Sequence, residues 1–122
     1  MTASTSLRVQ LRRAEPGVVI VDLSGDINRD AEGVLDQAFS DATATSHPTK
    51  IVLNFTEVVY VNSSGIALII GLLARARQQD CTVAAFGLSD HYREIFEITR
   101  LSDFIAIHAD EHAALDARPG AQ

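Results

Sequence analysis

The sequence predicts one α/β domain, with a mixed, mostly parallel sheet of about five strands covered by about four helices. Short apolar segments alternate with stretches whose apolar residues recur at helical spacing, in the order β-β-α-β-α-β-α-β-α. Such alternation is typical of a parallel sheet covered by helices. The first two strands are separated by little more than a Pro16-Gly17 turn, so they should form an N-terminal antiparallel hairpin.

The N-terminal third of the chain supplies this hairpin and the first helix. Residues 7–11 alternate between apolar and polar, which predicts a half-buried strand. Residues 18–23 are almost continuously apolar, which predicts a strand deeper in the sheet. A loop over 24–28 then leads to an amphipathic helix over 31–42, whose acidic residues cluster toward its N-terminal half, where the helix dipole favours them.

The rest of the chain continues to alternate between strands and helices. Ser89 is a favoured N-cap residue, and Tyr92, Ile95 and Phe96 behind it lie on one face of the expected helix. The expected elements are strands over 51–55, 82–86 and 104–107, a second apolar run over 58–61, and helices over 66–79, from Ser89-Asp90 onward and over 110–117.

Length and composition agree with a single folded unit. The chain has 122 residues, of which 47% are hydrophobic and 21% charged, an ordinary balance for one domain with one core. No internal repeat or linker interrupts it. We therefore expect a single domain over 1–122 with its core at about 7–117, and flexible ends at 1–5 and 118–122.

Charge and hydropathy argue against nucleic-acid and membrane partners. The net charge is −6, whereas binding to phosphates needs a clustered basic surface. The longest apolar stretch, 66–74, is about half of the roughly 20 residues that a membrane span requires, and residues 1–6 lack the apolar core of a signal peptide. Cys81 is the single cysteine, which suits a reducing compartment. We expect a cytoplasmic protein.

The segment Asn62-Ser63-Ser64-Gly65 stands where an apolar run gives way to a helix. Either serine could cap that helix, and Gly65 would permit a sharp turn, so a capped helix start needs no further function. The helix behind it, however, is apolar on almost every side for its first two turns. A domain this small cannot easily bury such a helix completely, so part of it should face a partner beside the serines.

These segments together resemble the STAS domain of bacterial anti-sigma-factor antagonists. The strand at 51–55 and the segment 61–69 match a strand and the Asp-Ser-Ser-Gly or Asp-Ser-Thr-Gly motif that opens an apolar helix in that family. Residues 23–28 resemble the family's loop after its second strand, and residues 96–101 resemble the end of its third helix. The resemblance extends over about 7–115, in the same order and spacing.

The resemblance implies a partner-switching function. In the family, the first serine of the motif is phosphorylated by an anti-sigma factor that is also a serine kinase of the histidine-kinase-like ATPase fold. The unmodified antagonist binds that anti-sigma factor and releases the sigma factor, and a PP2C-type phosphatase resets the phosphorylated form. By position, the acceptor here is Ser63. The implied switch-loop and partner-binding residues are Asp26, Asn28, Asn62, Ser64, Gly65, Ile66, Leu68 and Ile69.

Two positions depart from the family pattern. Asn62 and Asn28 stand where the family usually or often has aspartate. Fewer negative charges near Ser63 would make a phosphate less costly there, but a kinase that reads those carboxylates would recognise this chain less well. The alternative function is a constitutive STAS scaffold or partner-binding protein that is never phosphorylated.

Other motifs indicate no catalytic chemistry. His108 to His112 matches an H-x-x-E-H zinc pattern, but it straddles the end of a strand and a short helix instead of lying on one stable helix. Ser63 has no glycine two residues before it, as a nucleophile elbow requires. Cys81 is expected to be a small buried residue. We therefore expect a non-enzyme without metal or cofactor.

Overall fold

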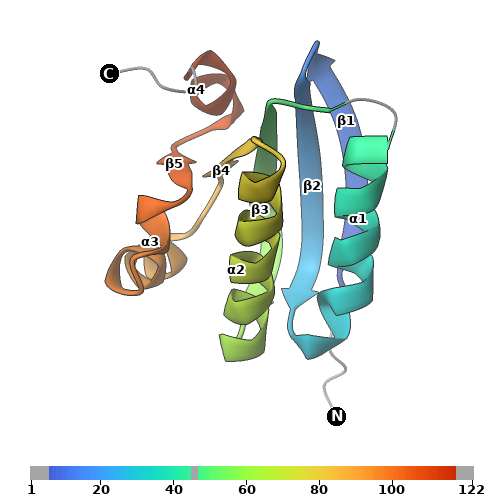
Figure 1. Cartoon of the computed structure of the whole chain (residues 1–122). Coiled ribbons are helices and arrows are strands. Elements are labelled where there is room, and N and C mark those ends of the chain that lie inside the picture. Colours follow the sequence, from blue (N-terminus) through green and yellow to red (C-terminus); the bar gives the residue numbers. More distant parts are fainter. Residues whose placement is uncertain (1–5, 45–46, 118–122) are drawn as a thin grey trace.

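The structure, a computed structural model, describes residues 6–44 and 47–117, so the predicted flexible ends at 1–5 and 118–122 lie outside the described residues. The predicted order of strands and helices is confirmed (Figure 1). The elements are β1 Arg8–Glu15, β2 Val18–Ile27, α1 Glu32–Ala44, β3 Lys50–Val61, α2 Ser63–Gln78, β4 Thr82–Phe86, α3 Asp90–Ile98, β5 Ala106–His108 and α4 Glu111–Asp116, with short 3-10 turns at η1 Arg29–Ala31 and η2 Leu101–Asp103.

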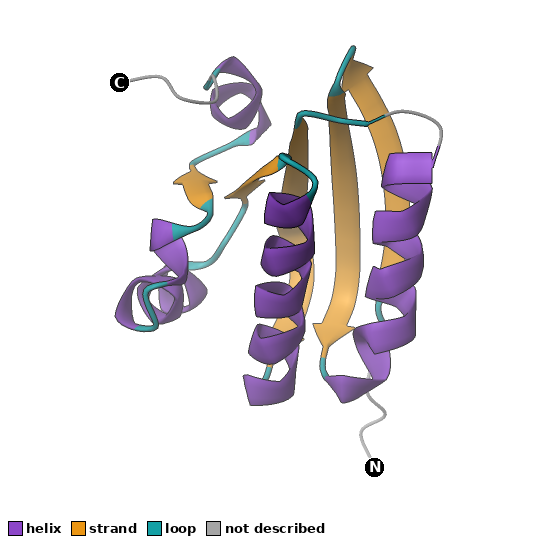
Figure 2. Cartoon of the chain, viewed as in Figure 1, coloured by secondary structure: helices purple, strands orange, loops and turns teal. Residues whose placement is uncertain are grey.

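The strands form one five-stranded sheet in the order β1-β2-β3-β4-β5, within the described part of the chain. β1 and β2 pair antiparallel and the other neighbours pair parallel, as predicted. Helices α1 and α2 lie side by side on one face of the sheet (Figure 2), and the larger apolar core, with Leu53, Phe39 and Ile69, lies beneath them. On the other face, Ala114 of α4 packs on a smaller cluster that includes Ile20.

Strands β2 and β3 are both longer than predicted. The expected loop at 24–28 is wrong, because β2 continues to Ile27 and pairs there with Val61. The apolar run at 58–61 is likewise the continuation of β3 and not a separate element. Register shifts between Asp22 and Ser24 and between Gly25 and Asp26 accommodate this extension. Bulges with glycine and polar residues interrupt a strand pattern without ending the strand.

The expected strand at 104–107 begins two residues later and ends one residue later in the structure. The structure places β5 at Ala106–His108, while Phe104 follows η2 and its side chain is 60% exposed. A short apolar run does not by itself determine which of its residues pair. The cap that was predicted for the third helix is confirmed, since the Ser89 hydroxyl accepts a hydrogen bond from the Tyr92 amide at 3.3 Å.

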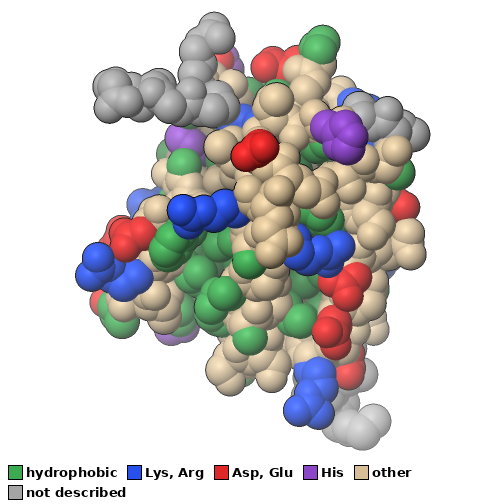
Figure 3. Space-filling view, in the orientation of Figure 1, with side chains coloured by type: hydrophobic (Ala, Val, Ile, Leu, Met, Phe, Trp, Pro, Cys, Tyr) green, Lys and Arg blue, Asp and Glu red, His purple; other side chains and the backbone are tan. Residues whose placement is uncertain are grey.

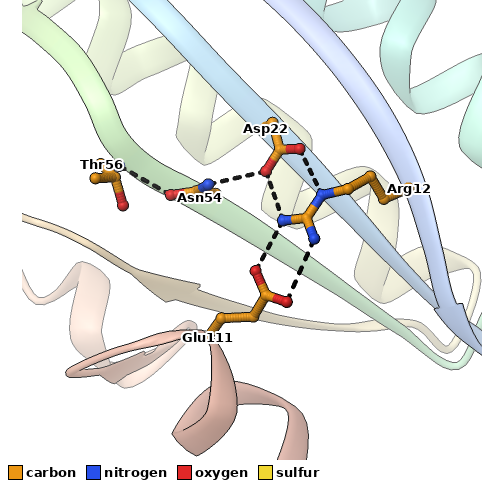
Figure 4. Close-up of polar contacts among 5 residues, drawn as sticks. All are labelled: Arg12, Asp22, Asn54, Thr56 and Glu111. Atoms are coloured by element: carbon orange, nitrogen blue, oxygen red, sulfur yellow. Dashed lines mark hydrogen bonds and ion pairs between the residues drawn. The ribbon is translucent and has the colours of Figure 1, made fainter.

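A polar network ties the hairpin to α4 across the back of the sheet (Figure 4). The Arg12 guanidinium donates to both carboxylate oxygens of Asp22, at 2.6 and 2.8 Å, and to Glu111 of α4 at 2.8 and 3.3 Å. Asn54 donates to Asp22 at 2.8 Å. The buried Lys50 ammonium donates to backbone carbonyls at the end of α4. These contacts hold a helix of only six residues on the sheet.

The network predicts a component of acid sensitivity. Hydrogen bonds from Arg12 lower the pKa of Asp22 below its ordinary value of 3.8. The folded state therefore binds this proton less readily than the unfolded state, so the associated stability is present above about pH 3.8 and is lost as the pH falls through the folded pKa. In urea titrations between pH 7 and pH 2.5, Asp22→Asn should lose stability less steeply below pH 4 than the wild type. Identical acid slopes would contradict this assignment.

Candidate functional site

The site lies where the carboxyl ends of β2 and β3 meet the start of α2. Ile27 and Val61 pair at the ends of these strands, and the Asn62 amide donates to the Ile27 carbonyl at 3.3 Å. Asn28 and Asn62 follow directly, and Ser63 is the first residue of α2. The parallel pairing thus brings two segments that are more than thirty residues apart in the sequence to one corner, at the lower end of α2 in Figure 1.

Asn62 caps α2, so the prediction that Ser63 or Ser64 is the cap is wrong. The Asn62 Oδ1 atom accepts the Gly65 amide at 2.9 Å, and the Asn62 backbone is extended. Asparagine caps helices as well as serine does. With the cap at Asn62, the helix begins at Ser63 and not at residue 66 as predicted. Both serines therefore lie within the first turn. Ser63 is exposed and Ser64 is half-buried, and the Ser63 hydroxyl is not the group that caps the helix.

Gly65 allows α2 to approach the end of β2 closely. A Cβ atom at this position would lie 2.0 Å from the Ile27 carbonyl oxygen and 2.8 Å from its carbonyl carbon. Real Cβ atoms essentially never make contacts this short. The two nearest atoms belong to the Ile27 backbone, which cannot move aside as a flexible side chain could. The glycine of the motif is therefore required by packing. The sharp turn that the sequence predicts at Gly65 is wrong, because Gly65 lies inside α2 and its φ is not positive.

Asn28 has the same local role at the neighbouring strand end. Its Oδ1 atom accepts the Asp30 amide at 3.0 Å and so caps η1. Each asparagine thus performs the capping that an aspartate would, without its charge. Asp26 lies half-buried two residues earlier, on the last part of β2.

The outer face of α2 carries small and apolar side chains behind Ser63. Ala67, Gly71 and Ala74 are exposed, and Ile70 is 50% exposed. Figure 3 shows hydrophobic side chains gathered over this helix and the surface beside it. We call Ser63, Ala67, Ile70, Gly71 and Ala74 the outer stripe of α2. A groove of about 1130 Å³ opens beside it, with Phe104 on its lining.

The apolar residues that were predicted for partner binding divide between surface and core. Ile66 and Leu68 are half-buried at the edges of the helix, whereas Ile69 is only 2% exposed and packs in the main core. Ile70, which sequence reasoning left out, is the large aliphatic residue that faces outward. When a helix is apolar on all sides, its sequence has no polar face from which the inward-pointing residues could be predicted.

Three further residues at the corner were not predicted. Val59 and Tyr60, on the last part of β3, are 69% and 52% exposed. The hydroxyl oxygen of Tyr92 in α3 accepts the Val61 amide at 2.9 Å. The helical spacing places Tyr92 on one face of its helix with Ile95 and Phe96, but no local signal shows which backbone group its hydroxyl reaches.

The zinc-like pattern does not assemble a metal centre. The exposed side chains of His112 and Asp116 pair at 3.1 Å on α4, and His108 lies on β5. Over residues 6–44 and 47–117, no group of three or more His, Cys, Asp or Glu side chains is placed to hold a metal ion. Cys81 is buried, as predicted, and burial raises the pKa of its thiol to about 11, so the reactive thiolate is disfavoured.

The cap at Asn62 can be tested by substitution. Asn62→Ala removes the side-chain acceptor for the Gly65 amide and should lower the free energy of unfolding by about 1 kcal/mol. Asn62→Asp keeps the acceptor and adds a negative charge at the helix N-terminus, so it should match or exceed the wild type by about 0.3–1 kcal/mol. Urea denaturation at neutral pH measures both variants. An alanine variant as stable as the wild type would show that this hydrogen bond does not stabilise the helix start.

Among the described residues, no helix has the length and apolarity needed to cross a membrane.

Comparison with known proteins identifies the family. The family model of the STAS domain matches residues 11–114. The anti-sigma-B factor antagonist of Listeria monocytogenes is 42% identical over 55 residues, which is 45% of this chain and 48% of that protein. The chain thus matches about half the length of its curated relatives.

Solved structures share the fold over almost the whole chain. An anti-sigma factor antagonist from Mycobacterium paratuberculosis has a TM-score of 0.77 at 19% identity, covering 94% of this chain and 96% of that one. The Bacillus cell fate determinant SpoIIAA in its phosphorylated form has a TM-score of 0.69 at 22% identity, covering 91% of this chain and 100% of the other.

Proposed function

The chain belongs to the STAS domain family, and from that premise we propose that it is an anti-sigma-factor antagonist that is switched by phosphorylation of Ser63. The unmodified protein binds an anti-sigma factor and releases the sigma factor. That anti-sigma factor is a serine kinase of the histidine-kinase-like ATPase fold, and a PP2C-type phosphatase resets the switch. The names of the relatives support the regulatory, non-enzymatic role.

The observation that carries the proposal is the placement of Ser63. Its side chain is exposed at the first position of α2, and Asn62 already caps the helix. Phosphorylation therefore removes no hydrogen bond that holds the helix start. A phosphate adds about −1.5 to −2 charges, and at a helix N-terminus it meets free amide groups and the positive end of the dipole. The fold should tolerate the modification.

The same charge opposes partner binding. Ser63 leads the outer stripe of α2, where Ala67 and Ile70 are exposed, and Val59 and Tyr60 lie exposed on the adjoining strand. A partner that covers these apolar side chains must also desolvate the phosphate, which costs several kcal/mol unless the charge is paired. Phosphorylation then weakens the complex and leaves the domain folded.

Phosphorylation by the anti-sigma-factor kinase of the source organism tests the site. The wild type incubated with this kinase and ATP should gain one phosphate in intact-mass spectra, and Ser63→Ala should gain none. Ser64→Ala, half-buried in the same turn, is the matched control and should be phosphorylated. A phosphate that persists in Ser63→Ala would exclude Ser63 as the acceptor.

The second candidate is a constitutive STAS partner protein without modification. Asn28 and Asn62 favour it. Both side chains are uncharged helix caps, so a kinase that recognises carboxylates at these two positions would have nothing to bind there. Pull-down with Ser63→Asp separates the two functions. The switch predicts that Ser63→Asp loses partners that the wild type retains, whereas the constitutive protein keeps them.

A further inference from the structure

The end of β3 that leads to Ser63 projects beyond its neighbour β4. Pairing of β3 with β4 ends at Asn54 and Phe86, whereas pairing with β2 continues to Val61 and Ile27. The seven residues 55–61 therefore have a neighbouring strand on the β2 side only. Whatever holds the other side of this extension influences the direction in which the chain enters α2.

Helix α3 occupies that other side. The rings of Phe55 and Phe96 meet edge to face with centroids 5.9 Å apart. Gly87, just before α3, approaches so closely that a Cβ atom there would lie 2.7 Å from the Thr56 backbone nitrogen. These contacts fix α3 against the extension, so a hydrogen bond from α3 to this strand has a defined geometry.

The last such contact is the Tyr92 hydroxyl. It accepts the Val61 amide at 2.9 Å, two residues before Ser63. On the opposite side, the next amide, that of Asn62, donates to the Ile27 carbonyl at 3.3 Å. Successive amides of an extended strand point in opposite directions, so the two bonds hold the chain from both sides at the point where it turns into α2.

We propose that Tyr92 is a positioning residue for phosphorylation of Ser63, acting through the Val61 amide to fix the backbone from which the acceptor hydroxyl projects. The inference rests on the proposed function in so far as Ser63 is the acceptor. Val61 is buried at 6% exposure, and a buried amide that loses its partner is costly. Removal of the hydroxyl therefore favours other arrangements of residues 61–63. A phosphoryl acceptor must be held in line with the transferred group, so such mobility slows the reaction.

The test uses Tyr92→Phe, which removes one oxygen and keeps the ring. The matched control is Thr43→Val, which also removes one hydroxyl; that hydroxyl donates to the Phe39 carbonyl at 3.0 Å in the last turn of α1, away from this corner. With the kinase that phosphorylates the wild type, we expect Tyr92→Phe to lower kcat about tenfold with KM within twofold of the wild type, and Thr43→Val to leave kcat unchanged.

Amide hydrogen exchange supplies a readout that needs no kinase. Tyr92→Phe should lower protection at least tenfold at residues 61–66 and leave the central strand residues 51–54 unchanged, while Thr43→Val should change neither. An unchanged kcat, or protection lost evenly over the whole domain, would overturn the positioning role. If no kinase modifies the wild type, the proposed function fails separately, and the exchange pattern alone decides whether Tyr92 holds this corner.

Discussion

Gly65→Ala is expected to be among the most damaging single-methyl changes in this chain. The added Cβ atom would lie 2.0 Å from the Ile27 carbonyl oxygen, and neither the end of β2 nor the start of α2 can move without disturbing the pairing of Ile27 with Val61. We expect the free energy of unfolding to fall by about 1–3 kcal/mol or more, as in overpacked cores, together with loss of protection at the start of α2.

A second glycine in the same helix provides the control. At Gly71, a Cβ atom would meet nothing within 4 Å, and an interior helical glycine costs about 0.5–1 kcal/mol relative to alanine. Gly71→Ala should therefore stabilise the domain by roughly this amount. Urea denaturation compares the two variants with the wild type. Equal effects of the two substitutions would show that close approach to Ile27 is not what requires glycine in the motif.

Ile70→Asp is expected to abolish most partner binding without unfolding the protein. Ile70 is 50% exposed on the outer stripe of α2, so a charge there costs little in the free protein. In a complex that covers this face, the carboxylate would be desolvated among apolar groups. We expect the dissociation constant for the anti-sigma factor to rise about 100-fold, the size of a hot-spot effect, as measured by isothermal titration calorimetry.

Val34 on the neighbouring helix α1 serves as its control. It is 37% exposed, and Asp36, which pairs with Arg75 of α2 at 2.7 Å, marks the side of α1 that faces α2. Val34 lies two residues away and so on the opposite flank of the helix. Val34→Asp should bind like the wild type. A similar loss in both variants would indicate a general effect of added charge instead of an interface on α2.

Much of the fold follows from local patterns in the sequence. The hairpin, the parallel order and the position of Ser63 at the start of an apolar helix are predictable because alternation, helical spacing and the Asn-Ser-Ser-Gly segment are local. The extension of β2 through Gly25 to Ile27 was missed, since bulges interrupt the local alternation although pairing with β3 continues. The sequence does not single out Asn62 as the cap, because Asn62, Ser63 and Ser64 each have a side-chain oxygen that can accept a hydrogen bond from a backbone amide of the helix.

Long-range contacts explain the remaining differences. Tyr92 reaches Val61 across 31 positions, and Arg12 reaches Glu111 across 99. The partner of a tyrosine hydroxyl or a guanidinium depends on how the elements pack, and helical spacing specifies only that Tyr92 lies on the same helix face as Ile95 and Phe96. The inward position of Ile69 and the outward position of Ile70 also depend on where the sheet lies, because both residues are equally apolar.

In the proposed switch, phosphate on Ser63 controls partner binding. The most direct measurement is the affinity of purified unmodified protein and of its Ser63-phosphorylated form for the anti-sigma factor, by calorimetry under identical conditions. Phosphorylation should weaken binding by about 100-fold or more, while urea denaturation should show that both forms are folded with similar stability. Equal affinities of the two folded forms would contradict the switch and favour the constitutive partner protein.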